Sequence, residues 1–188
     1  MNIHKNILLS CFISVFLFLL FSCDTNNNSK SKQDKAYNKQ DKINKNKEEA
    51  KLLVSVSKNY INLINYSNYI KAKDSLTLET KSLLDTFNVD ITNHLKNLKE
   101  LSREELVLIP DKNDVLVLED KTFTKDGEEK RQKKYLEKIN DMVETQINLI
   151  DELTETSNNS SINALANEAE EILLEHKENF ESLIEKIN

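Results

Sequence analysis

Glycine and proline are almost missing from this chain, whose 188 residues include one glycine, Gly127, and one proline, Pro110. Both residue types interrupt helices and form tight turns. A sequence with so few of them is suited to long helices joined by few turns, so we expect an all-α fold.

The spacing of apolar residues predicts four helices after residue 47. In four segments they recur at intervals of three and four, the period of a helix with one buried face. The segments cover about residues 48–72, 77–101, 128–155 and 161–187. Their leading apolar residues are Leu53, Val56, Tyr60, Ile64 and Ile70; Leu84, Phe87, Ile91, Leu95 and Leu98; Leu136, Ile139, Val143, Ile147 and Ile150; and Ile162, Leu165, Leu173, Phe180 and Leu183. A polar turn at 157–160 separates the last two segments, and Ser160 or Ser161 is placed to cap the final helix. We therefore expect a four-helix bundle.

The connection between the second and third helices breaks this period. Residues 106–109 and 115–118 are apolar runs on either side of a turn that contains Pro110. They could pair as a small hairpin, or lie extended across the end of the bundle, because an isolated two-stranded ribbon is only marginally stable. The sequence thus predicts a short extended or hairpin-like connection, which either carries a recognition feature or simply joins the two helices.

The first 22 residues have the pattern of a secretory signal sequence. Lys5 precedes an apolar run at residues 7–21, and a small residue precedes Cys23. The segment Leu20-Phe21-Ser22-Cys23 has the form of a lipobox. The pattern predicts that residues 1–22 are removed and that acyl chains on Cys23 anchor the protein to a membrane.

Two alternatives to lipidation stay open. An uncleaved transmembrane anchor needs about 20 apolar residues, more than residues 7–21 supply. A cleaved but unlipidated product would expose a lone thiol at Cys23, which invites disulfide exchange outside the cell. Cys11 is removed with the signal sequence, so the mature fold is expected to depend on packing alone.

Residues 24–47 have the composition of a tether. Seven lysines, three aspartates and six asparagines accompany only three apolar residues, Ala36, Tyr37 and Ile43. So little apolar surface cannot offset the entropy cost of ordering the chain. We expect a disordered spacer, residues 23–47 with the lipidated cysteine included, followed by a helical domain at 48–188. A basic strip that lies against anionic lipid is the alternative.

The lipobox, the tether and the composition resemble those of outer-surface lipoproteins of Borrelia, a spirochaete. Phe21 is bulky where enterobacterial lipoboxes prefer a small residue, and spirochaete lipoproteins tolerate that departure. The 24 asparagines, 24 lysines and 16 isoleucines have AT-rich codons, which fits the same resemblance. The resemblance covers the first 47 residues well. It implies an outer-membrane lipoprotein on the cell surface with a host-facing role.

The charge of the expected domain excludes some partners. Residues 48–188 hold 18 lysines and arginines against 29 aspartates and glutamates, which gives a formal net charge of −11. Nucleic acid requires a basic face, so the charge argues against it, and it also argues against the domain itself lying on anionic lipid. An acidic surface suits a basic partner or simply keeps an exported protein soluble.

Few residues in the domain carry chemistry. His94 and His176 lie on different predicted helices, and a two-histidine metal site would require these helices to meet. Because no HExxH, Glu-x-x-His or cysteine pair is present, we expect partly buried structural histidines and no metal. A single glycine does not form a phosphate loop or a nucleophile elbow, so neither an enzyme nor a cofactor is expected. Solvated faces are expected for the carboxylate pairs Glu104-Glu105, Glu128-Glu129 and Glu170-Glu171.

Three tyrosines on the first helix have two interpretations. Tyr60 lies on the apolar stripe, whereas Tyr66 and Tyr69 lie off its centre. They either form an exposed aromatic patch for a partner or flank the core of the bundle.

The sequence favours a lipid-anchored, surface-exposed binding protein that is not an enzyme and that engages a host or vector protein. The alternative is a periplasm-facing structural or assembly lipoprotein of the cell envelope. A small-molecule ligand is not expected, because no stripe shows the small residues that would open a cavity.

Overall fold

The computed structural model describes residues 27–73, 76–110 and 127–187, with side chains in the first range described from residue 46. The chain divides into two units, Met1–Asn44 and Lys45–Asn188. The second unit contains the helical bundle.

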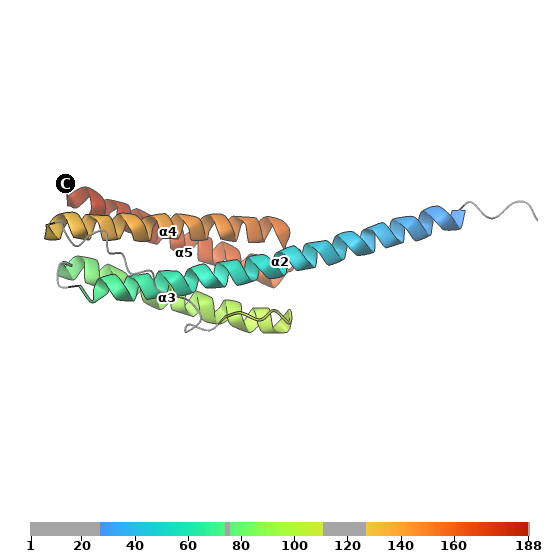
Figure 1. The fold of residues 1–188 in the computed structure, drawn as a ribbon, viewed down its shortest axis with the longest axis horizontal. Helices are drawn as coiled ribbons and strands as arrows, with labels where there is room; N and C mark the ends of the chain where they lie inside the picture. Colours follow the sequence, from blue (N-terminus) through green and yellow to red (C-terminus); the bar gives the residue numbers. More distant parts are fainter. Residues whose placement is uncertain (1–26, 74–75, 111–126, 188) are drawn as a thin grey trace, which may run out of the picture. The chain divides into compact units, whose positions relative to one another are not determined.

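Four helices make up the described chain: α2 (Asn27–Lys71), α3 (Leu78–Glu104), α4 (Glu128–Thr156) and α5 (Ser160–Lys186) (Figure 1). The described residues include no strand. The predicted all-α bundle is therefore confirmed. The ends of α3, α4 and α5 lie within three residues of the expected positions.

The tether segment differs from the prediction. α2 begins at Asn27, so residues 27–47 are helical in a region where disorder was expected. The reason is that the sequence of this segment contains neither glycine nor proline and is rich in lysine, which has good helix propensity. A helix that is already formed in the bundle extends at little cost per residue, because nucleation is the expensive step.

The starts of the helices are fixed by local hydrogen bonds. Thr77 Oγ1 accepts from the backbone N–H of Thr80 at the start of α3, at 3.2 Å. Asn159 Oδ1 accepts from the backbone N–H of Ser161, at 2.9 Å, and caps α5. The predicted cap at Ser160 or Ser161 was thus one or two residues late, because an asparagine side chain competes well for the same backbone groups.

The end of α3 has a Schellman motif with leucine where glycine is usual. The N–H of Val107 donates to the carbonyl of Ser102 at 2.8 Å, and the N–H of Leu106 donates to that of Arg103 at 3.1 Å. Leu106 has a φ of 58°, a left-handed conformation that a leucine adopts at a cost. After it, Leu108 is exposed, whereas Val107 and Ile109 pack against the core. Residues 111–126 lie outside the described chain, so pairing of 106–109 with 115–118 stays a prediction.

The order of the helices gives the bundle a crossover connection. On α2 and α3, Asn68 bonds Asn88 and the later residue Lys71 bonds the earlier residue Asp85, so these helices are antiparallel. On α5 and α3, His176 bonds Asp90 and Lys186 bonds Glu79, so these are antiparallel too. On α2 and α4, Asn59 bonds Gln146, and the amine of Lys138 lies over the Tyr66 ring, which gives the same result. It follows that α3 and α4 are parallel.

The two ends of the α3–α4 connection therefore lie at opposite ends of the bundle. In Figure 1, α3 ends at the right of the bundle and α4 begins at the left. The 27 residues of α3 correspond to about 40 Å of helix. The connection therefore joins the C-terminal end of α3, at one end of the bundle, to the N-terminal end of α4, at the other. The sequence did not predict this arrangement.

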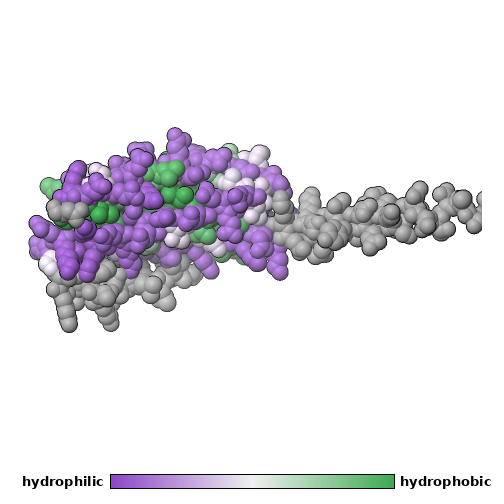
Figure 2. Space-filling view, turned by 90° about the horizontal axis from the view of Figure 1, so that it is seen from above, coloured by the Kyte–Doolittle hydropathy of each residue, from purple (hydrophilic) through white to green (hydrophobic). Residues whose placement is uncertain are grey.

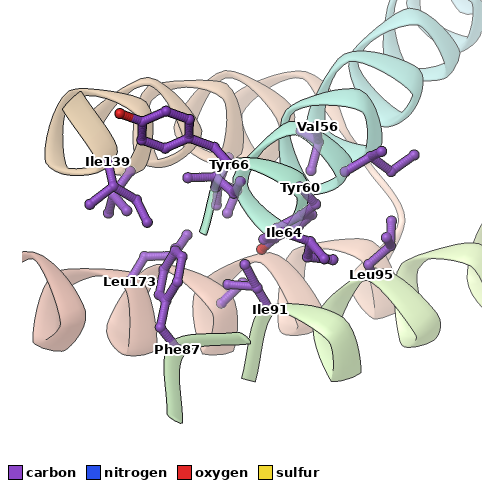
Figure 3. Packing of buried hydrophobic residues seen from close by; sticks show 14 of the residues in the cluster. Val56, Tyr60, Ile64, Tyr66, Phe87, Ile91, Leu95, Ile139 and Leu173 are labelled. Carbon is purple, nitrogen blue, oxygen red and sulfur yellow. The ribbon is translucent and has the colours of Figure 1, made fainter. Parts of the chain in front are cut away.

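The core of the bundle is built from the predicted apolar stripes. Side chains from α2, α3, α4 and α5 converge in Figure 3, with Ile64 of α2 near Ile91 of α3. Most of the stripe residues are buried, and the others are half-buried at the edges. The face shown in Figure 2 is mostly hydrophilic, with small apolar patches. The fold thus offers a packed core and a polar surface.

Candidate functional site: a buried histidine cluster

The two histidines of the bundle lie at the contact between α3 and α5. His94 is one turn after Asp90 on α3, and His176 is on α5. The Nε2 atom of His176 lies 2.9 Å from Oδ2 of Asp90. The side chains of His94 and His176 are only 5% and 4% exposed, so the expectation of partly buried histidines was too mild. We call Asp90, His94 and His176 the histidine cluster.

Aromatic packing holds His176 in place. Its ring meets the edge of Phe87 with the two centroids 5.1 Å apart and the planes at 84°. Phe87 and Phe180 make a second edge-to-face contact at 5.2 Å. Residues 87, 91, 94 and 98 recur at helical spacing on the buried face of α3, which places His94 on the same face as Phe87. The cluster is thus part of the packed core.

The surroundings of His94 oppose its protonation. Burial lowers the pKa of His94 below its ordinary value, the charges of Glu168 and Asp90 raise it in part, and a charge on His176 lowers it again. The Nδ1 atoms of both histidines are buried, with no hydrogen-bond partner among the described residues. A proton on His94 would therefore place a charge in an apolar environment.

Apolar side chains from all four helices surround His94. It lines a cavity of about 10 Å³ together with Val56, Leu98, Ile150, Leu153, Tyr60 and residues at the start of α5. Such a cavity is about large enough for one water molecule. The space beside His94 is therefore on the scale of a water molecule.

A second buried polar contact joins α2 to α4. Asn59 Nδ2 donates to Oε1 of Gln146 at 2.8 Å and to the carbonyl of Met142 at 3.2 Å. Gln146 is fully buried. Burial raises the pKa of the neighbouring Tyr60 hydroxyl, and the Gln146 side chain offsets part of that shift. The tyrosine therefore stays neutral at physiological pH. The contact can set the register of α2 against α4, because a buried polar pair is satisfied in only one alignment.

The structure decides between the two interpretations of the tyrosines. Tyr60 and Tyr66 are buried and Tyr69 is half-buried, so they flank the core and form no exposed aromatic patch. The amine of Lys138 lies 5.1 Å from the centroid of the Tyr66 ring, and that of Lys73 lies 3.9 Å from the Tyr69 ring. Each lysine amine thus lies over a tyrosine ring.

The carboxylate pairs lie at the surface, as predicted. Glu104, Glu105, Glu128, Glu129 and Glu171 are exposed. Glu170 is half-buried. Glu105 also accepts a hydrogen bond of 2.6 Å from Asn159, which joins the end of α3 to the α4–α5 turn.

Three further points concern the lipobox, metal binding and membrane-spanning helices. The lipobox residues Leu20, Phe21, Ser22 and Cys23 lie outside the described residues. In the ranges that the structure describes, no group of three histidine, cysteine, aspartate or glutamate side chains is arranged to hold a metal ion. Within the same ranges, no helix is both long enough and apolar enough to cross a membrane.

Sequence reasoning missed Asp90 and Gln146. Neither contact has a local signal, because Asp90 bonds His176 across 86 residues of the chain and Gln146 bonds Asn59 across 87.

Comparison with known proteins adds no relative. No protein family, no curated protein sequence and no solved structure matches the chain.

Proposed function

We propose that the chain is a lipid-anchored binding protein displayed on the outer surface of a cell, with no enzymatic activity. The observation that carries the proposal is Cys23, which directly follows an apolar run and the residues Leu20-Phe21-Ser22. Acyl chains on this cysteine would hold the protein at the membrane permanently, whereas one chain alone binds only weakly.

The histidine cluster supports a role for the bundle other than catalysis. Its two imidazole rings are buried in the core, whereas the Asp90 side chain is half-buried. The cavity beside His94 has room for about one water molecule. The proposed partner is therefore a macromolecule that contacts the polar exterior of the bundle, in keeping with a host or vector protein.

Replacement of the cysteines tests the anchor. In cells that express the full chain, Cys23→Ala is expected to abolish incorporation of labelled palmitate and to move the protein from the detergent phase to the aqueous phase. Cys11→Ala is the matched control, because it removes the other cysteine of the chain and should leave both readouts unchanged. A Cys23→Ala variant that still incorporates labelled palmitate would show that the lipid anchor at Cys23 is wrong.

The alternative, a periplasm-facing assembly lipoprotein, has the same anchor and differs in exposure. Display requires the bundle to be accessible from outside the cell. The alternative requires it to be shielded by the outer membrane and to co-purify with envelope proteins.

A further inference from the structure

We propose that the histidine cluster of Asp90, His94 and His176 makes the contact between α3 and α5 sensitive to acid, so that the bundle loosens when His94 is protonated. The proposal concerns the bundle alone and does not depend on the lipid anchor or on the identity of a partner.

The first step is the difference between the two histidines. The His176 ring has a carboxylate beside it, because its Nε2 atom lies 2.9 Å from Oδ2 of Asp90. His94 has no carboxylate at that distance among the described residues, and its Nδ1 atom is buried without a partner. A proton on His94 would therefore be a buried charge without a hydrogen-bonded carboxylate, which is costly.

The groups that face His94 from each helix define that cost. From α5 they are Glu168 and His176, and from its own helix α3 the charged group is Asp90. From α2 the titratable group is Tyr60, which stays neutral, and from α4 the side chains beside the cavity are Ile150 and Leu153. The carboxylates attract a proton, but burial is the largest influence and opposes it.

The sign of the effect follows from linkage. Because the pKa of His94 is lower in the folded chain than its ordinary value of 6.5, the unfolded chain binds the proton more tightly. The stabilisation is fully present above pH 6.5 and is lost as the pH falls from there toward the lower pKa of the folded state. A charged His176 adds to the loss, since it repels a charge on His94.

The position of the cluster explains why loosening would act on α3 and α5. His176 contacts Phe87, and Phe87 contacts Phe180, so the cluster and the aromatic pair share one layer of the interface. Separation of the two helices at low pH would expose both phenylalanine rings, which are completely buried in the folded bundle.

The test compares thermal unfolding at pH 7.5 and pH 5.0, with the full chain in a mild detergent and helix content followed by circular dichroism. We expect the Tm of the wild type to fall by about 3 °C more than that of His94→Leu, a shift typical of one such group in a domain of this size. Gln146→Leu is the matched control, because it also replaces a buried polar residue but introduces no change in titration. Between pH 7.5 and pH 5.0 its Tm should fall by as much as that of the wild type, including the part of the fall that carboxylates cause.

An independent measurement covers the case in which His94→Leu fails to fold. In the wild-type chain, the ring protons of His94 are followed by NMR from pH 8 to pH 5, and we expect them to titrate below pH 6.5, together with broadening of the α3 and α5 signals. Equal Tm losses in the wild type and His94→Leu, or titration of His94 at or above pH 6.5, would overturn the proposal.

Discussion

The rings of Phe87 on α3 and Phe180 on α5 meet edge to face, with their centroids 5.2 Å apart. Both side chains are completely buried. Replacing Phe180 with alanine removes this contact and leaves a cavity, so we expect the free energy of unfolding to fall by about 3–5 kcal/mol. Urea denaturation followed by circular dichroism measures the change.

The control for this variant is Leu78→Ala. Leu78 is also a large apolar residue, but it is 87% exposed in the first turn of α3. Its replacement should change the free energy of unfolding by no more than about 0.5 kcal/mol. Similar losses in the two variants would mean that the α3–α5 contact is not formed as described.

Leu106→Gly is expected to stabilise the protein. Leu106 adopts a left-handed conformation at the end of α3 and its side chain is 93% exposed, so glycine loses little packing there. Relief of the backbone strain should raise the free energy of unfolding by about 1 kcal/mol. Leu108→Gly is the matched control, because Leu108 is equally exposed but has no left-handed conformation, and it should give no gain. A loss of stability in Leu106→Gly would contradict the geometry of this turn.

The buried contact between Gln146 and Asn59 should be needed for the α2–α4 interface. Gln146→Ala removes the acceptor of a 2.8 Å hydrogen bond from Asn59 and leaves a cavity. We expect the free energy of unfolding to fall by about 1–3 kcal/mol in urea titrations, the usual cost of breaking a buried hydrogen bond. Asn148→Ala changes an exposed amide on the same helix and should have almost no effect.

Asn159 should contribute to stability as the cap of α5. Asn159→Ala removes the acceptor for the N–H groups of Ser161 and Ile162, and it also removes the hydrogen bond to Glu105. A loss of about 1 kcal/mol is expected from thermal or urea unfolding. Asn159→Ser should restore part of this loss, because serine also caps helices. If serine and alanine behave alike at this position, capping is not the role of Asn159.

Much of the helical structure was predictable because it depends on residues that are close together in the sequence. The stripes of α3, α4 and α5 repeat at the helical period, and most of their residues are buried in the structure. The predicted polar turn at 157–160 corresponds to the break between α4, which ends at Thr156, and α5, which begins at Ser160.

The direction of the helices was not predictable, because it depends on contacts between distant residues. Nothing local distinguishes a short link from residues that connect the far ends of two parallel helices. The same limit applies to the site. The burial of His94 and His176 followed from their place near the stripes, whereas their meeting across α3 and α5 depends on residues 86 positions apart, Asp90 and His176. The length of α2 was missed for another reason: low apolar content argues against packing but does not prevent a helix from extending.

Protease treatment of intact cells tests the proposed display most directly. Cells that express the full chain are exposed to a protease, and the bundle and a periplasmic control protein are then detected by immunoblotting. We predict that the bundle is degraded while the periplasmic control stays intact. Survival of the bundle until the outer membrane is broken would contradict surface display and would favour a periplasm-facing lipoprotein.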